Sequence, residues 1–371
     1  MGLEEIEQVV QVLRSGWISN GPKTRELESA IADYLGLVKE QVIVVTNCTA
    51  ALHVSLLSLG ITNGDEVLVS DFTFPATGHS VMYCGAVPRF VDIDPASYDI
   101  DPSKLEEMIN ERTKAIIPVH AFGQPAEMDE INRIAEKHGL SVIEDAACAF
   151  GAQFRGSMAG TMGDFGCYSF HALKGITCGE GGALVAKDKK MAEKARRLCN
   201  YGIEPAWDRH SNVSVPVFQN LGYNYKISDI QSAVVLAQLR KINTFMEKRN
   251  LLAKIWSREL APMVTKGLLR EQMSPNYTVH SHQAMVIILN ESINRNLIMK
   301  TMREKFGIET TLGTYSSHIQ PVYGSKDVCP VAKVTSDQSL SLPFYFELNE
   351  DTIHYCAASL SESIEIVKRS E

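Results

Sequence analysis

The sequence has no long apolar run. No segment of the 371 residues approaches the roughly 18 apolar residues that a membrane-spanning helix needs. The first residues, MGLEEIEQVVQVLRSGW, lack both the basic start and the apolar centre of a secretion signal. These absences argue against a membrane partner and predict a cytoplasmic protein.

The eight cysteines form no paired motif. They are scattered along the chain, none belongs to a C-x-x-C pair, and most lie in apolar segments. This distribution favours reduced thiols over disulfides or zinc ligands. His280 and His282 offer two imidazoles close together, but no further ligand pattern accompanies them. We therefore expect no metal site.

Positive charge is neither in excess nor clustered. The chain has 36 Lys and Arg against 44 Asp and Glu, and no basic run is longer than DKK or ARR. This mixture argues against nucleic acid as a partner. The length and the 45% content of hydrophobic residues predict a globular protein with more than one folding unit.

Short β-rich runs alternate with helical segments between Gln41 and about Lys187. The runs include VIVVT, EVLVS, KAIIPVH, SVIEDA, FGCYSF and GALVAK, while TAALHVSLLSLG and AEMDEINRIAEKHG have helical spacing and end at glycine. This rhythm predicts an α/β sheet with helices on its faces. A long helical stretch from Asp229 leads into a mixed region with the strand AMVIILN. We place a large domain at residues 1–240 and a smaller C-terminal domain at residues 241–371.

Polar residues follow two of the predicted strands, where ligands bind in doubly wound sheets. Thr49 and Ala50 follow VIVVT and would open a helix whose free N–H groups suit a phosphate. Simple capping of that helix by Asn47 and Thr49 is an equally good interpretation. Glu144 and Asp145 end another strand, where a buried carboxylate needs a cationic partner. An ordinary strand-end cap explains this pair equally well.

Lys174 lies between the strand end at Ser169 and the glycine-rich turn GEGG. Confinement can lower the pKa of a lysine amine and let it form a Schiff base, although taken alone a snorkelling or salt-bridged lysine is the commoner case. Together with a phosphate cradle and a strand-end Asp, this lysine meets the needs of pyridoxal 5′-phosphate. That cofactor requires an anchor for its phosphate, a carboxylate for its pyridine nitrogen and an amine for its aldehyde.

The sequence resembles the DegT/DnrJ/StrS sugar aminotransferases, which are fold-type I pyridoxal-phosphate enzymes. The resemblance runs over most of the chain and includes GWISNGP (16–22), DFTFPAT (71–77), VIEDAACAFGA (142–152), GEGGALV (179–185) and LGYNYKISDIQSA (221–233). It implies a large domain with a mainly parallel seven-stranded sheet sandwiched by helices, and a smaller α+β C-terminal domain.

The resemblance also implies roles for single residues. Lys174 matches the Schiff-base lysine, which also moves the proton between substrate and cofactor. Asp145 matches the partner of the pyridinium nitrogen, and Phe74 matches the aromatic residue stacked on the ring. The backbone amides of Thr49 and Ala50 match part of the phosphate cradle.

The remaining implied contacts lie around the phosphate and the substrate. The Ser169 hydroxyl matches another phosphate donor, and Asn224 matches an asparagine that reaches the phosphate from a neighbouring subunit. That last role implies a homodimer with active sites shared across the interface. Tyr315 and His318 resemble residues near the sugar-nucleotide entrance, although an ordinary surface loop is an equally good interpretation.

Four positions depart from the family pattern. Cys148 stands where Gln or His usually bonds near the phenolic oxygen of the cofactor, and a thiol is a weaker donor. Cys48 replaces Gly or another small residue, Gly175 replaces Asn, and Lys226 stands where Arg is more frequent. None of these changes removes a group that the chemistry requires.

The implied activity is transfer of an amino group from glutamate or glutamine to a nucleotide-linked keto-sugar. The mechanism would be ping-pong, through a Lys174 internal aldimine and pyridoxamine 5′-phosphate. A cyclitol or aminocyclitol ketone is an alternative acceptor. The related sugar dehydratases carry His at the Schiff-base position, so Lys174 argues against them. A non-catalytic binding or regulatory protein is the remote alternative, because it would have no need to keep Lys174, Asp145, Phe74 and Asn224 together.

Overall fold

A seven-stranded sheet forms the centre of the larger part of the molecule. The computed structural model describes residues 1–203, 215, 217–218 and 220–370. The strand order is β1-β10-β9-β6-β5-β2-β4, and only β10 runs against the other six. These strands are β1 (Val42–Val45), β2 (Glu66–Ser70), β4 (Val87–Val91), β5 (Thr113–Ile117), β6 (Ser141–Asp145), β9 (Phe165–Ser169) and β10 (Gly182–Ala186). The mainly parallel seven-stranded sheet expected from the sequence is confirmed.

Both faces of this sheet are covered, which explains why its strands read as continuous apolar runs. In β1, Val42 and Val44 pack in a cluster with residues of α2 (Pro22–Leu35) and α7 (Asp229–Leu239). Ile43 and Val45 point to the opposite face, where their cluster includes residues of α3 (Cys48–Leu59) and α6 (Lys189–Cys199). The remaining helices around the sheet are α1 (Leu3–Ser15), α4 (Ala76–Tyr83) and α5 (Met128–His138).

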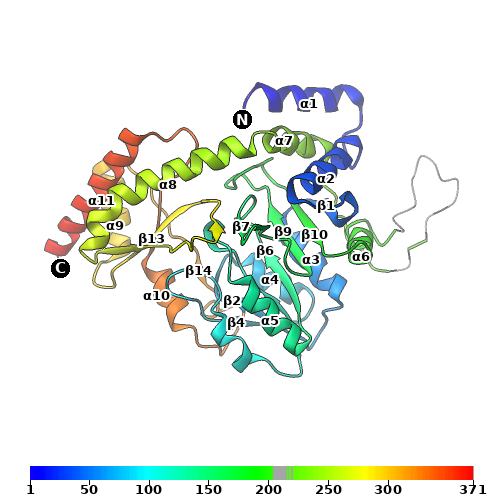
Figure 1. The fold of residues 1–371 in the computed structure, drawn as a ribbon, viewed down its shortest axis with the longest axis horizontal. Coiled ribbons are helices and arrows are strands. Elements are labelled where there is room, and N and C mark those ends of the chain that lie inside the picture. The colour runs from blue at the N-terminus through cyan, green and yellow to red at the C-terminus, as the bar shows by residue number, and fades with distance from the viewer. Residues whose placement is uncertain (204–214, 216, 219, 371) are drawn as a thin grey trace.

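The long helical stretch expected after Asp229 is two helices. α7 ends at Leu239, and α8 (Ile242–Thr265) begins after a break at which Lys241 has φ −104° and ψ 4°. The Lys241 ammonium forms ion pairs with Glu4 and Glu5 of α1. Beyond the break, α8 crosses the molecule from the N-terminal helices to α9 and α11 (Figure 1).

The C-terminal residues build a smaller antiparallel sheet with helices. Its strands are β11 (Leu269–Glu271), β13 (Met285–Leu289) and β15 (Ser339–Leu342), and the helices are α9 (Arg295–Phe306), α10 (Pro330–Gln338) and α11 (Glu350–Ser370). One hydrophobic cluster around Trp256 draws all its members from residues 252–367. This separate cluster supports a domain boundary near residue 240, which stays a prediction.

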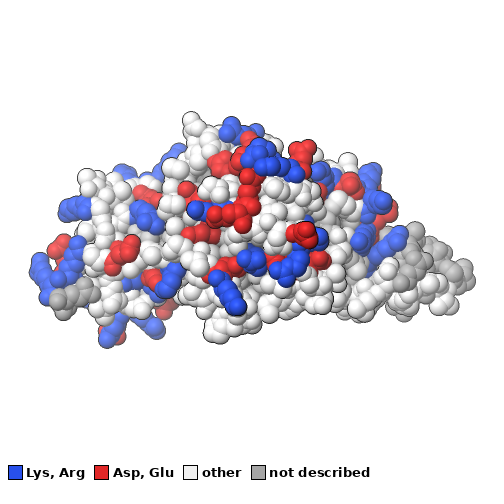
Figure 2. All heavy atoms as spheres, turned by 90° about the horizontal axis from the view of Figure 1, so that it is seen from below, with Lys and Arg blue, Asp and Glu red and all other residues white. Residues whose placement is uncertain are grey.

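Two short strands connect the C-terminal part to the large sheet. β14 (Tyr315–Ser316) pairs with β3 (Phe72–Thr73), which follows β2 directly. The face shown in Figure 2 carries acidic and basic side chains interspersed. None of the described helices combines the length and the apolar character of a membrane span.

Candidate active site

Most of the predicted cofactor residues surround one cavity at the carboxyl ends of the parallel strands. The cavity has a volume of about 820 Å³. Its walls come from segments that follow β1, β2, β6 and β9, and from residues 283–284 and 311–314 of the C-terminal part. Seven of the predicted residues line it: Thr49, Ala50, Phe74, Asp145, Cys148, Ser169 and Lys174.

Lys174 follows β9 in a short turn and contacts a thiol. Its Nζ donates a hydrogen bond to Cys148 Sγ at 3.1 Å. Burial acts to lower the pKa of Lys174, but negative charge on Cys148 and Asp145 outweighs burial, so the pKa is raised above its usual value. Confinement alone suggested the opposite direction, because it left out the thiol and the carboxylate.

Asp145 ends β6 and is only 5% exposed. The Thr77 hydroxyl donates to Oδ2 at 2.8 Å, and the Ala147 N–H donates to Oδ1 at 3.1 Å. These two donors fix the carboxylate in one orientation. Sequence reasoning missed Thr77, whose one signal was its place at the end of DFTFPAT.

The neighbouring Glu144 is fully buried and has a structural role. It pairs with His120 Nε2 at 2.9 Å and accepts N–H groups of Gly160, Met162 and Gly163 at 2.6–2.7 Å. With four donors around it, this carboxylate holds the turn before β9 in place. The two adjacent carboxylates therefore differ, because Asp145 lines the cavity and Glu144 does not.

The start of α3 has backbone N–H groups that can donate hydrogen bonds to a ligand. Asn47 caps the helix, since its Oδ1 accepts the Ala50 N–H at 2.8 Å. Capping thus accounts for Ala50 in this chain. In the part of the chain that the structure describes, no group accepts the N–H of Cys48 or Thr49. These two donors and the nearby Ser169 hydroxyl suit a phosphate.

The close packing of β10 against α3 explains why position 182, the last of the GEGG turn, is glycine. A Cβ at this position would lie 2.6 Å from both Asn47 C and Cys48 N, which are backbone atoms. Glycine therefore lets β10 approach the first turn of α3. The strand in this way supports the helix end where the phosphate donors lie.

Phe74 presents its ring to the cavity, and 65% of the residue is exposed. The ring of Tyr315 lies 6.3 Å from it between centroids, because β14 pairs with β3 and places Tyr315 opposite Thr73. Tyr315 itself does not line the cavity wall. Its predicted contact with the sugar nucleotide stays a prediction.

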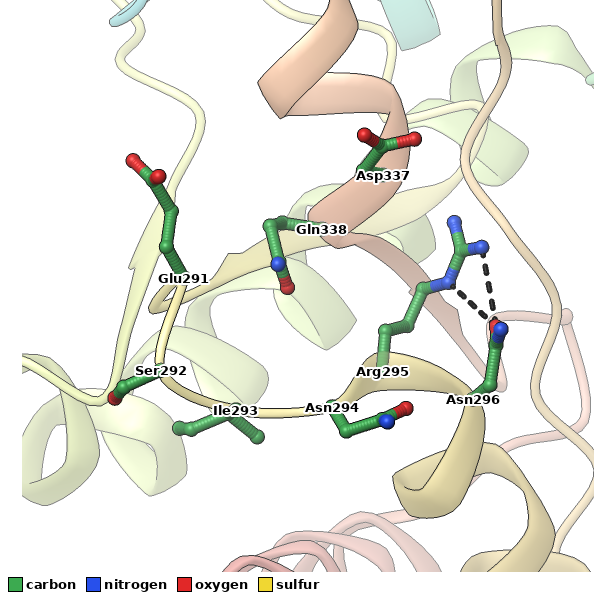
Figure 3. A pocket seen from close by; sticks show the side chains of 8 residues that line it. All are labelled: Glu291, Ser292, Ile293, Asn294, Arg295, Asn296, Asp337 and Gln338. Carbon is green, nitrogen blue, oxygen red and sulfur yellow. Dashed lines mark hydrogen bonds between the residues drawn. The ribbon is translucent and has the colours of Figure 1, made fainter.

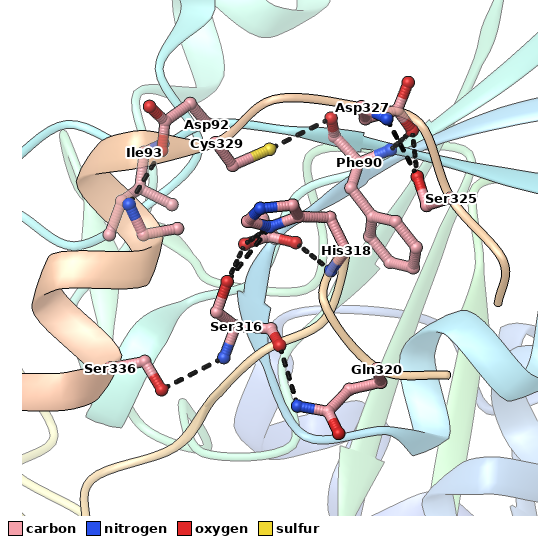
Figure 4. Close-up of polar contacts among 12 residues, drawn as sticks. Phe90, Asp92, Ile93, Ser316, His318, Gln320, Ser325, Asp327, Cys329 and Ser336 are labelled. Carbon is pink, nitrogen blue, oxygen red and sulfur yellow. Dashed lines mark hydrogen bonds and ion pairs between the residues drawn. The ribbon is translucent and has the colours of Figure 1, made fainter. Parts of the chain in front are cut away.

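His318 lies outside the cavity wall and binds Asp71. The Asp71 carboxylate accepts the His318 N–H at 2.6 Å, lies 2.9 Å from His318 Nδ1 and accepts the Ser316 hydroxyl at 2.6 Å. Figure 4 shows the contacts around His318 and Ser316. These bonds connect the C-terminal loop to the segment that carries Phe74, and the predicted substrate contact of His318 stays a prediction.

One group of metal-ligand atoms occurs among the described residues: Asp71, His318 and Cys329, within 4.8 Å of one another. Cys329 Sγ donates to Phe90 O at 3.3 Å, and the other two side chains bond each other. We therefore interpret the group as a hydrogen-bonded connection between loops.

The predicted histidine pair also has protein partners. His280 and His282 stack with ring centroids 4.0 Å apart. His280 Nδ1 accepts the His282 N–H at 2.8 Å, and His280 Nε2 lies 3.1 Å from Gln272 Oε1. Both nitrogens of His280 are thus engaged within the chain.

Asn224 is exposed and does not line the cavity of its own chain. Its Oδ1 accepts a hydrogen bond from Lys226 Nζ at 2.7 Å. The predicted contact of Asn224 with a neighbouring subunit stays a prediction.

His53, on α3 one turn after Thr49, also lines the cavity, and sequence reasoning missed it. Its Nδ1 lies 3.1 Å from the Tyr225 hydroxyl, while its buried Nε2 has no partner in the described chain. Burial lowers the pKa of His53, so the ring is neutral near pH 7.

A second, smaller hollow of about 380 Å³ lies at the start of α9. Figure 3 shows Arg295 turned toward Asn296, and its guanidinium also donates to Ser336 O at 2.8 Å. None of the predicted site residues lines this hollow.

The large cavity fits pyridoxal 5′-phosphate by the chemistry of its lining. It offers open N–H donors for a phosphate, a fixed carboxylate in Asp145, an exposed ring in Phe74 and the amine of Lys174. These groups define the class of the protein as a pyridoxal-phosphate-dependent enzyme.

A sequence model of the DegT/DnrJ/EryC1/StrS aminotransferase family matches residues 1–361, and the chain belongs to this family. The spore coat polysaccharide biosynthesis protein SpsC of Bacillus subtilis is 34% identical in an alignment 363 residues long that covers 95% of this chain and 92% of SpsC.

Solved structures agree with this family. The aminotransferase TlmJ from Streptoalloteichus hindustanus superposes with a TM-score of 0.92 at 28% identity, over 99% of this chain and 98% of TlmJ. Spr1654 from Streptococcus pneumoniae matches in its PMP form with a TM-score of 0.92 and in its PLP form with 0.91, both at 26% identity. These matches cover 99% of this chain and 98% and 97% of Spr1654. The fold-type I aminotransferase fold and the pyridoxal-phosphate cofactor predicted from the sequence are confirmed.

Proposed function

We propose that this protein transfers an amino group from glutamate or glutamine to a nucleotide-linked keto-sugar, as a cytoplasmic homodimer. The observation that carries the proposal is that Lys174, Asp145 and Phe74 line one cavity. The first turn of α3, with its N–H groups that are unbonded in the described chain, lines the same cavity. The similarity to SpsC, a polysaccharide biosynthesis protein, supports a sugar as the acceptor.

The residues that would hold the cofactor have roles that their surroundings support. When bound, the cofactor supplies an aldehyde and an electron-withdrawing ring. Asp145, held by Thr77 and Ala147, stabilises positive charge on the ring nitrogen. The exposed ring of Phe74 would pack against the ring of the cofactor. The first turn of α3 and the Ser169 hydroxyl bind the phosphate.

Lys174 carries the proton in both halves of the reaction. Its pKa is raised by the neighbouring Cys148 and Asp145 despite burial, so the amine readily holds a proton. In the donor half it takes the proton from the substrate carbon, and in the acceptor half it returns a proton to the sugar carbon. The flexible stem of the lysine lets one amine serve both positions.

The acceptor side of the cavity is formed by the C-terminal part of the chain. Residues 311–314 line the wall, and Tyr315 follows them at the edge of Phe74. At about 820 Å³, the cavity is in the range that accommodates small-molecule substrates. A cyclitol ketone lacks the nucleotide, so comparing the two acceptors separates the alternatives.

The first test is an absorbance spectrum of the purified protein with pyridoxal 5′-phosphate, before and after glutamate or glutamine. We expect a band near about 420 nm that falls while a band near about 330 nm rises. Keto-sugar nucleotides should then restore the first band faster than cyclitol ketones do. Lys174→Ala is the control and should show neither the first band nor turnover, with an unchanged thermal melt of the apoprotein.

Three results would contradict parts of the proposal. A first band that ignores both amino acids would reject the donor. Restoration only by cyclitol ketones would reject the nucleotide sugar. Absence of any band would favour a non-catalytic protein with this fold.

A further inference from the structure

The contact between Cys148 and Lys174 has a second chemical consequence beyond amino transfer. Sγ and Nζ are 3.1 Å apart, and both side chains line the open cavity. We propose that Cys148 and Lys174 form a covalent modification site for peroxides, in which oxidation joins Sγ to Nζ as a sulfenamide.

Cys148 differs from the other cysteines in its surroundings. Burial raises the pKa of Cys84, Cys178 and Cys199 to about 12, so these thiols stay protonated at neutral pH. Cys148 is half-buried, lines the cavity and contacts the amine of Lys174. Peroxides react with cysteine side chains that they can reach, so its place in the cavity wall and its contact with an amine set Cys148 apart.

Arg249 of α8 supplies a second positive charge. Its guanidinium interacts electrostatically with Cys148 and donates one hydrogen bond to His282 O at 3.3 Å. Burial lowers the pKa of Arg249, and Cys148 is the influence that opposes it. Gly175 lies beside this guanidinium, and a Cβ at that position would be 3.2 Å from Arg249 Nη1. The Arg249 guanidinium thus adds a second cation near the thiol.

The proposed reaction has two balanced steps. In the first, the Cys148 thiolate attacks a peroxide oxygen; the O–O bond breaks, the sulfur becomes a sulfenic acid and, with one proton, the leaving group becomes an alcohol or water. In the second, the neutral Lys174 amine attacks that sulfur; the N–S bond forms, the S–O bond breaks, and water leaves with the amine proton. Two thiols reverse the product, giving the free cysteine, the free amine and a disulfide.

The first step favours the second. Burial acts to lower the pKa of Lys174, and the charge of Cys148 is the largest opposing influence. A neutral sulfenic acid removes that charge, so the lysine loses its proton more readily. The amine must also be free of the cofactor. Protein loaded with pyridoxamine phosphate is therefore susceptible, while pyridoxal phosphate protects.

The test is peptide mapping of protein loaded with pyridoxamine phosphate and treated with hydrogen peroxide. After alkylation without reductant, we expect trypsin to release residues 138–155 joined to 156–187, uncleaved after Lys174. The joined pair should weigh about 2 Da less than the two separate peptides, the loss of two hydrogen atoms. Reduction with a thiol should separate the peptides and restore cleavage after Lys174.

The cleavage after Lys174 separates the proposal from a disulfide. A bridge from Cys148 to Cys178 has the same mass change but leaves Lys174 free, so trypsin would join 138–155 to 175–187. Cys148→Ser should abolish the uncleaved pair, and Cys178→Ser, the matched control, should retain it. The proposal is overturned if Cys148 becomes sulfinic acid or a disulfide while Lys174 stays cleavable. Because this readout needs no substrate, it does not depend on the proposed amino transfer.

Discussion

Asp145 depends on a donor from a distant part of the sequence, the Thr77 hydroxyl at 2.8 Å. Asp145→Asn should keep the cofactor bound through its phosphate but lower kcat at least about 100-fold, the scale of a lost electrostatic stabiliser. Steady-state kinetics and a cofactor titration would measure both effects. Thr77→Val keeps the carboxylate and should cost less. A kcat of Asp145→Asn within about twofold of the parent would reject the pyridinium role.

At the residue scale, the sequence identified the groups that follow strands, because the carboxyl ends of parallel strands meet at one edge of the sheet. Lys174 and Asp145 were found in this way. The contact of Lys174 with Cys148 and the unpaired nitrogen of His53 were not, since both depend on how side chains from separate elements turn. Tertiary contacts of this kind have no local signal in one sequence.

Among the elements, β10 and α3 meet at Gly182, whose Cβ position lies 2.6 Å from backbone atoms of Asn47 and Cys48. Gly182→Ala should push the start of α3 away, lower the free energy of unfolding by about 1–3 kcal/mol and weaken cofactor binding. Urea unfolding of the apoprotein and a cofactor titration would measure these changes. Gly175→Ala is the matched control, because its Cβ meets only the movable end of Arg249. Equal cofactor affinity in parent and Gly182→Ala would contradict this account.

The attachment of α1 to the rest of the fold depends on the charge of the Glu5 carboxylate. Burial acts to raise the pKa of Glu5, but the Lys241 ammonium and the Gly2 N–H outweigh it and lower the pKa from 4.5 to about 2. A lowered carboxyl pKa stabilises the fold above pH 4.5, and this contribution is lost as the pH falls toward 2. The stability difference between the parent and Glu5→Gln should therefore shrink between pH 6 and pH 3.

Thermal melts across that pH range would measure the difference. Glu4→Gln serves as the control, because Glu4 pairs with the same Lys241 but is largely exposed. A stability difference for Glu5→Gln that is constant with pH would show that the ion pair does not hold α1.

Element types were predicted well from the sequence and element ends less well. Strands such as β2 and β9 are buried at every position, and polar side chains occur only at their ends. Glycine marked the ends of α3 and α5, since Gly60 and Gly139 have φ of 84° and 65°. The break between α7 and α8 was not predicted, because no glycine or proline marks it and Lys241 bonds α1, more than 230 residues away in sequence.

For the whole molecule, the question is whether one chain completes the site. Asn224 is exposed and lies outside the cavity of its own chain, as a residue would that serves a neighbouring subunit. Lys174→Ala and Asn224→Ala homodimers should each be strongly impaired. Mixed in equal amounts with subunit exchange, they should regain about one quarter of parent activity, because half of the dimers are hybrids with one intact site of two.

The result separates two architectures. If Asn224 served its own chain, each site of a hybrid would still lack either the lysine or the asparagine, and mixing would restore nothing. Mixing Lys174→Ala with parent protein controls for inhibition by an inactive subunit, since its activity should fall only in proportion to the parent chains present. Recovery in the first mixture would show that the active site forms between two copies of the chain.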